Sequence, residues 1–145
     1  MAFRFPLASV LRVREILEQR EERALQQIQM EMARISHQIE EQTAVIAGVY
    51  DAQAEALRQP ISAGVLHSFQ WEEQKAIERR KVLLAALQTL EQKREKQIKI
   101  YQVAHRNHEA LISMKKAQRN AYELEQARAQ QKSLDDLFIA RRQRI

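Results

Sequence analysis

The sequence predicts an all-α protein in which two long helices fold back on each other as an antiparallel coiled-coil hairpin. Three observations support this class: long stretches without helix breakers, one central interruption, and a seven-residue repeat of apolar side chains before it. The 145 residues include only two glycines and two prolines, and 30% of the residues are charged. So few turn-forming residues and so many charges favour long, exposed helices over a compact globule.

The central interruption is the segment 58–64, RQPISAG, which contains Pro60 and Gly64. Proline does not fit inside a helix and glycine weakens one, so we expect the helices to part between Gln59 and Gly64. The predicted first arm covers about residues 7–58, the turn 59–65 and the second arm about 66–142. We expect the two arms to form a single elongated coiled-coil domain over residues 1–145.

A heptad repeat runs along the first arm. In such a repeat, written abcdefg, positions a and d face the partner helix. Ten of the fifteen a and d positions are apolar, which predicts a coiled-coil seam that polar residues weaken locally. Position a falls at Leu11, Glu18, Leu25, Met32, Ile39, Ile46 and Gln53, and position d at Leu7, Arg14, Glu21, Ile28, Ile35, Gln42, Val49 and Ala56.

The second arm is less regular. Its apolar residues recur at steps of three, four or seven, and we expect no single strict heptad to hold along it. Arg94, His105, Lys115 and Arg119 interrupt the stripe. We predict one imperfect helix with apolar residues at Ile77, Leu83, Leu84, Leu87, Leu90, Ile98, Tyr101, Leu111, Ile112 and Tyr122.

Composition narrows the function. The absence of cysteine removes disulfides, thiolate nucleophiles and thiolate metal sites. The longest apolar run, residues 44–50, is far shorter than the ~20 residues that span a bilayer, and charges interrupt the N-terminal stretch before a signal-peptide core can form. We therefore expect a soluble, cytoplasmic protein.

Charge is divided unevenly between the two arms. Residues 1–60 carry 7 basic and 9 acidic side chains, which leaves 17 basic and 10 acidic ones for residues 61–145, so the arms carry −2 and +7. Opposite signs favour pairing of the arms. The surplus on the second arm makes nucleic acid a partner to consider, but glutamates interleave with the basic residues, and we predict no nucleic-acid binding.

No cluster of titratable residues predicts catalysis or a cofactor. His105, His108 and Glu109 share one helical face, but no further ligand is spaced to complete a zinc site, so a polar seam is the better interpretation. Asp135 and Asp136 are adjacent and point about 100° apart, which prevents them from acting as a facing acid/base pair. No phosphate-binding loop, HExxH or GxSxG motif occurs. We predict a protein that is not an enzyme and binds neither metal nor cofactor.

Two features point to protein partners. Tyr50, Phe69 and Trp71 lie near the break, where they either close the turn as an aromatic cluster or anchor a partner. Folding the chain back at about residue 62 places Leu7 opposite roughly residue 117, so we expect later residues to lack a partner within the chain. This overhang offers Tyr122, Leu124, Leu134, Leu137, Phe138 and Ile139, and it ends in Arg141, Arg142 and Arg144.

The two ends of the sequence carry a resemblance. FRFPLASVLRVREILEQREE at the start, and HEALISMKKAQRNAYELEQARAQQKSLDDLFIARRQR at the end, resemble the flagellar export protein family FliJ. The resemblance rests on the Phe-x-Phe-x-Leu opening, the pair Tyr122 and Glu123, and a Gln-Lys-x-Leu-Asp stretch from Gln131 to Asp135. It extends along nearly the whole chain.

The resemblance implies a non-catalytic stalk of the flagellar type III export apparatus, similar to the central subunit of rotary ATPases. It implies association with the hexameric export ATPase FliI, with the export gate protein FlhA and with export chaperones. It also implies a monomer that is cytoplasmic and peripheral to the inner membrane, through its partners, at the flagellar base.

The resemblance also assigns residues to the partners. The implied gate-binding residues at the tip are Tyr50, Phe69, Ala76 and Arg80, with Glu73 where the family tends toward an aromatic or aliphatic residue. The implied ATPase-binding residues in the overhang are Leu134, Leu137, Phe138, Arg141 and Arg142.

Three alternatives stay open. The equivalent stalk of a virulence type III secretion system would share the fold and mechanism. A homodimeric scaffold would need one continuous helix through Pro60 and Gly64, at a cost of ~3 kcal/mol or more. A nucleic-acid-binding hairpin would need an acid-free basic face.

Overall fold

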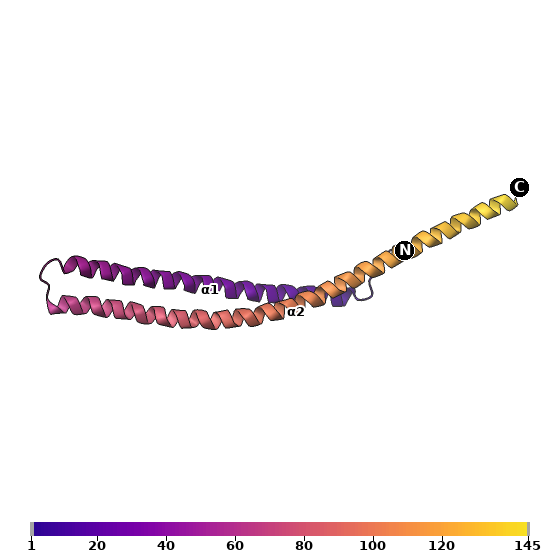
Figure 1. Cartoon of the computed structure of the whole chain (residues 1–145). Coiled ribbons are helices and arrows are strands. Elements are labelled where there is room, and N and C mark those ends of the chain that lie inside the picture. The colour runs from indigo at the N-terminus through magenta and orange to yellow at the C-terminus, as the bar shows by residue number, and fades with distance from the viewer. Residues whose placement is uncertain (1, 145) are drawn as a thin grey trace. The chain divides into compact units, whose positions relative to one another are not determined.

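In the computed structural model, which describes residues 2–144, the chain forms two helices, α1 over Ala8–Ala56 and α2 over Ala63–Gln143. Within residues 21–100 the helices lie side by side and run antiparallel (Figure 1). The described residues contain no strand. The predicted all-α class, with two long helices in an antiparallel hairpin, is therefore confirmed.

The chain divides into two compact units, each of which takes part of both helices. The hairpin unit is the continuous segment Glu21–Ile100, and the terminal unit combines Met1–Arg20 with Tyr101–Ile145. In the terminal unit the start of α1 packs on α2, and α2 continues past it.

The seam predicted for α1 is confirmed. Every predicted a and d position from Leu11 to Ala56 is buried or half-buried, and Ile35 and Val49 are the most shielded. Leu7, one residue before α1, is the exposed exception. The polar residues at these positions therefore lie in the interface between the helices.

The helix α2 has a more regular seam than the sequence predicts. From Leu66 to Leu111 its residues at alternating steps of three and four are buried or half-buried, with Arg94 as the exposed exception, and Ala86 and Ile98 are half-buried beside this repeat. The repeat escaped notice because small and polar residues occupy many of its positions, while Ile77, Leu84 and Ile112 lie beside it and stay exposed. The seam positions are Leu66, Phe69, Glu73, Ala76, Arg80, Leu83, Leu87, Leu90, Arg94, Gln97, Tyr101, Ala104, His108 and Leu111.

The turn lies slightly earlier than the sequence predicts. Ser62 is the N-cap of α2: its Oγ accepts a hydrogen bond from the Val65 amide at 3.3 Å. Gly64 therefore sits in the first turn of α2 rather than in the loop. The end of α1 tightens into i→i+3 hydrogen bonds from Arg58 and Gln59, so the connection spans residues 57–62.

The core is thin. Among the described residues, only Phe5, Ile35, Val49, Ala76 and Leu90 are buried, and none is polar. Some polar seam residues are paired across the two helices: in the hairpin unit the Gln97 amide donates to the Glu21 carboxylate at 2.6 Å and to its backbone carbonyl at 3.0 Å. Such side-chain pairs fix the register of the two helices where apolar contacts are few.

Candidate partner-binding surfaces

The tip of the hairpin unit exposes a hollow lined by both apolar and polar side chains. Tyr50 is 64% exposed and Leu57 is also exposed, and together with Gln53, Ala54, Gln70 and Glu73 they line one depression between α1 and α2. An exposed tyrosine beside a hollow gives a partner both apolar area and a hydroxyl.

The other residues assigned to the tip differ in accessibility. Phe69 and Arg80 occupy seam positions and are half-buried. Ala76 is only 2% exposed, so it packs against α1 and presents no surface that a partner reaches while the helices are paired. The expectation that Ala76 contacts a partner directly therefore needs correction: its small side chain lets the helices approach each other.

The three tip aromatics do not form a cluster. Within residues 2–144 no ring contact joins Tyr50, Phe69 and Trp71. Trp71 is well exposed, and the Lys75 ammonium lies 4.0 Å from the centroid of its ring as a cation–π pair. The interpretation of an aromatic cluster that closes the turn is therefore wrong, and Tyr50 and Trp71 are available to partners.

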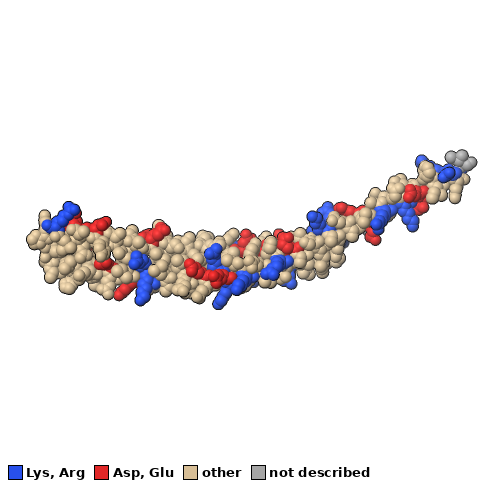
Figure 2. Space-filling model, in the orientation of Figure 1, with Lys and Arg blue, Asp and Glu red and all other residues tan. Residues whose placement is uncertain are grey.

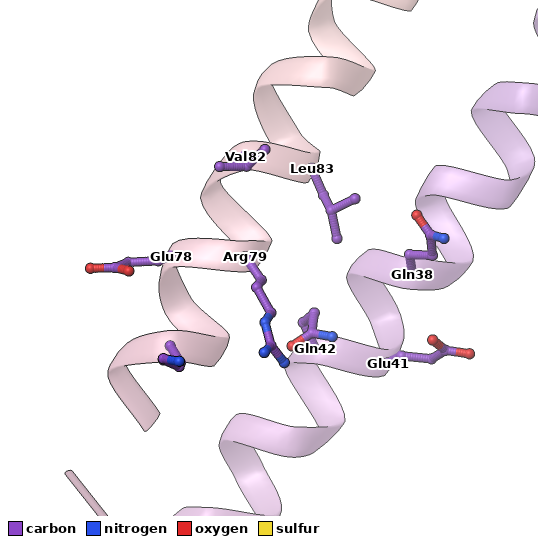
Figure 3. A pocket seen from close by; sticks show the side chains of 8 residues that line it. Gln38, Glu41, Gln42, Glu78, Arg79, Val82 and Leu83 are labelled. Atoms are coloured by element: carbon purple, nitrogen blue, oxygen red, sulfur yellow. The ribbon is translucent and has the colours of Figure 1, made fainter. Parts of the chain in front are cut away.

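A shallow groove crosses the seam near the middle of the hairpin unit (Figure 3). Leu83 points between the helices, Arg79 extends toward Gln42 of α1, and Glu78 points away. The Gln42 Oε1 atom is buried and accepts no hydrogen bond from a described residue. This polar seam position lowers the stability of the pair because a shielded acceptor without a donor costs about 1–3 kcal/mol.

The last part of α2 is a helix without a packing partner. Every described residue from Glu123 to Arg144 is exposed, including Leu134, Leu137 and Phe138, and Phe138 is 69% exposed. These three side chains and Arg141 line a depression along one side of the helix. Arg141 and Arg142 lie in the last turn, where positive charge complements the helix dipole.

The overhang begins later than the sequence predicts. The ring of Tyr122 packs against Phe3 with centroids 5.6 Å apart, and Tyr122 is half-buried. The segment before α1 thus lies along α2, with Phe5 buried and a turn closed by the hydrogen bond from the Ala8 amide to the Phe5 carbonyl. The predicted overhang did not include this contact, whose signal in the sequence is the pair Phe3 and Phe5 before Pro6.

A carboxylate held by two histidines marks the seam of the terminal unit. Nδ1 of His105 lies 2.8 Å from Oε1 of Glu18, and Nδ1 of His108 is hydrogen-bonded to Oε2. The histidines act as donors, because an ionised carboxylate only accepts hydrogen bonds. The hydrogen bond from His105 is the main cause that lowers the pKa of Glu18, and the same bond raises the pKa of His105.

The two histidines thus serve the polar seam that the sequence suggests. Their Nδ1 atoms are taken up by Glu18, and the ring of His105 also stacks on Tyr101 with centroids 5.9 Å apart. In the part of the chain that the structure describes, no group of three potential ligands is placed to hold a metal ion.

Charges of both signs are distributed along the surface. Figure 2 shows Lys and Arg interleaved with Asp and Glu along the face that it presents. No helix among the described residues is long and apolar enough to cross a membrane.

The fold and these surfaces define a class: a coiled-coil hairpin with a thin core, whose exposed apolar side chains gather at the tip and along an unpaired terminal helix. The sequence matches the family model described as flagellar FliJ protein over residues 3–144, and the chain belongs to this family. It is thus a protein associated with flagellar type III export. No match was found among the curated proteins or among the solved structures.

Proposed function

We propose that the protein is a non-catalytic stalk that links the hexameric export ATPase to the export gate and works with export chaperones. The observation that carries the proposal is the unpaired end of α2, where an apolar stripe and several arginines stay exposed. Isolated helices are marginal in water, so a helix of this kind gains stability when a partner receives it. On this proposal the protein is a monomer that works in the cytoplasm, at the membrane only through its partners.

The ATPase-binding surface is the stripe of Leu134, Leu137 and Phe138 with Arg141 and Arg142. The five side chains are exposed and lie within ten residues, close to the C-terminal end of α2. Apolar side chains supply buried area inside a ring, and arginines add attraction to an acidic entrance that salt weakens.

The gate-binding surface is the tip hollow. Tyr50 supplies the exposed anchor of the hollow, while Phe69 and Arg80, which do not line it, contribute from the seam beside it the parts of their side chains that stay accessible. Glu73 also lines the hollow, which favours a partner segment that has a basic or amide group beside its apolar contact.

The two surfaces are tested with reciprocal variants. Truncation after Arg128, or the pair Leu134→Glu and Phe138→Glu, should abolish stimulation of the export ATPase and leave binding to the gate protein unchanged. Ile139→Glu is the matched control, because Ile139 is exposed on another side of the same helix. Tyr50→Ala should do the reverse and weaken gate binding by about thirtyfold, as removal of a hot-spot residue does.

Circular dichroism of each variant checks that the helices persist. Full stimulation by the truncated protein would refute insertion of the terminal helix into the ATPase.

A further inference from the structure

A single carboxylate on α1 joins two histidines on α2 in the terminal unit. Glu18 accepts hydrogen bonds from Nδ1 of His105 and of His108, one on each of its carboxylate oxygens. The side chains of Glu18 and His108 are only 15% and 16% exposed, whereas that of His105 is 47% exposed. These three residues, the histidine clasp, cross the seam and therefore act on the pairing of the two helices.

The clasp matters more in the terminal unit than such a group would in the hairpin unit. Of the buried side chains among the described residues, Phe5 alone lies in the terminal unit, and the other four lie in the hairpin unit. The polar pair of the hairpin unit, Gln97 with Glu21, contains no group that titrates near neutral pH. His37 pairs with a glutamate of its own helix, and His67 is exposed near the tip. Protonation of histidine should therefore act mainly on the terminal unit.

The charges around the clasp favour protonated histidines. His105 lies next to Glu18 and Glu109, and the hydrogen bond to Glu18 is the main cause that raises the pKa of His105. Carboxylates outnumber the one arginine at or beside the seam, and negative surroundings favour the charged form of a histidine. The other titratable groups at or beside the seam, from residue 14 to 22 and from 101 to 109, are Arg14, Glu15, Glu21, Glu22 and Tyr101.

We propose that the histidine clasp is a pH-sensitive lock on the terminal unit, which holds the start of α1 on α2 while the histidines are protonated and loosens when they lose their protons. A hydrogen bond from a protonated histidine to a carboxylate is about twice as strong as a bond between neutral groups. Loosening also frees the segment before α1, in which Phe5 is buried and Phe3 packs against Tyr122. The hairpin unit stays paired through its own seam.

The lock is strongest between pH 4.5 and 6.5, where Glu18 is ionised and His105 is protonated, and it weakens as the pH rises through the raised pKa of His105. The inference stands apart from the stalk proposal, because it concerns the isolated chain and its test needs no export protein.

The test is hydrogen exchange of the full-length protein at about pH 6 and about pH 8.5, on either side of the histidine titration. Protection is expressed relative to the intrinsic exchange rate at each pH, so that the chemistry of exchange cancels. Protection of residues 11–18 should fall by about two- to fivefold at the higher pH, the effect expected of one partly exposed ion pair. Protection of residues 76–90, which belong to the hairpin unit, should stay the same.

Variants assign the pH dependence to the clasp. His105→Gln combined with His108→Gln should remove the pH dependence in residues 11–18. His67→Gln is the matched control, because His67 is an exposed histidine of the hairpin unit, and it should keep the pH dependence of the wild type. His105→Lys should keep residues 11–18 protected at the higher pH, because a lysine stays charged there.

Three results would overturn the proposal: equal protection of residues 11–18 at both pH values, an equal fall in residues 76–90, or wild-type pH dependence in the double glutamine variant. If the double variant does not fold, His105→Lys decides the question. A fall in its protection as large as that of the wild type would likewise overturn the lock.

Discussion

Replacing Gln42 with leucine should stabilise the protein. Gln42 occupies a d position of the seam, and its Oε1 atom is buried without a hydrogen-bond donor among the described residues. Removing a shielded acceptor that has no hydrogen-bond donor should stabilise the fold by about 1–3 kcal/mol. Full burial of a leucine contributes about 1.5–3 kcal/mol, and since Gln42 is half-buried we count about half of that.

The expected gain is about 2 kcal/mol after allowance for imperfect fit. For a chain of this size, each kcal/mol moves the melting temperature by ~2–4 °C, so Gln42→Leu should raise it by about 4–8 °C. Leucine is close to glutamine in volume, and the neighbouring Leu83 already supplies an apolar surface between the helices (Figure 3).

The measurement is thermal and urea unfolding followed by circular dichroism at 222 nm. Gln26→Leu is the matched control, because Gln26 lies on the same helix but is exposed at a position away from the seam. It should leave the midpoint nearly unchanged. Equal gains from both leucines would trace the effect to helix propensity or self-association, and a lower midpoint for Gln42→Leu would mean that the glutamine side chain is satisfied in solution.

Two further predictions follow from the seam. Ile35→Asp places a charge at a buried position and should lower the free energy of unfolding by several kcal/mol. Met30→Asp, at a side chain that is 72% exposed, should have little effect. Equal unfolding midpoints for the two variants would mean that the seam is misassigned. For Glu18→Gln, the loss of stability relative to wild type should depend on pH. The pKa of His105 is raised in the fold because the residue lies next to Glu18 and Glu109. The stability that this histidine contributes is therefore fully present below pH 6.5 and is lost as the pH rises through the raised pKa. The pKa of Glu18 is lowered, so the stability that this carboxylate contributes is present above pH 4.5 and is lost as the pH falls through the lowered pKa. The loss in Glu18→Gln should therefore be largest between pH 4.5 and 6.5, and urea titrations that show the same loss at every pH from 4 to 9 would contradict the pairing.

The first arm was predictable because its seam is mostly apolar. Leu25, Ile28, Ile35 and Ile39 repeat at heptad spacing, and no other stripe of that helix competes with them. Once these residues set the register, the polar positions Glu18 and Glu21 could be placed in the seam as well. The structure confirms this placement and adds their partners, which lie more than seventy residues away in the sequence.

The second arm was not predictable by the same route. Its seam includes Glu73, Ala76, Arg80, Gln97 and His108, which hydropathy does not distinguish from surface residues. Their burial depends on α1: a small side chain at Ala76 permits close approach, and Gln97 and His108 are held by carboxylates of the first helix. Information of this kind lies in the pairing of two segments and not in either segment alone.

The N-terminal segment and the helix cap show a second limit. Phe3 and Phe5 lie before the first helical turn, where periodicity has no meaning, so the contact of Phe3 with Tyr122 of α2 and the burial of Phe5 follow from tertiary packing. The weight given to Gly64 as a helix breaker placed the predicted start of α2 too late, at about residue 66 instead of Ala63. A glycine in the first turn costs little once a serine side chain satisfies a free amide of that turn.

The spacing of the apolar residues explains why α2 buries this seam and leaves most of its isoleucines exposed. Ile77, Leu84, Ile98 and Ile112 recur at multiples of seven, so they supply one apolar row at position e, whereas a coiled-coil seam needs two rows at alternating steps of three and four. The a and d rows supply both, with Leu66, Phe69, Leu83, Leu87 and Leu90 in them, and so they face α1. The isoleucine row is then left beside the seam, and Val103 at position c and Met114 at position g are left outside it. A helix with apolar residues beside its seam as well as in it satisfies one partner within its own chain and keeps exposed apolar side chains for others, which is the property that the proposed link between export components requires.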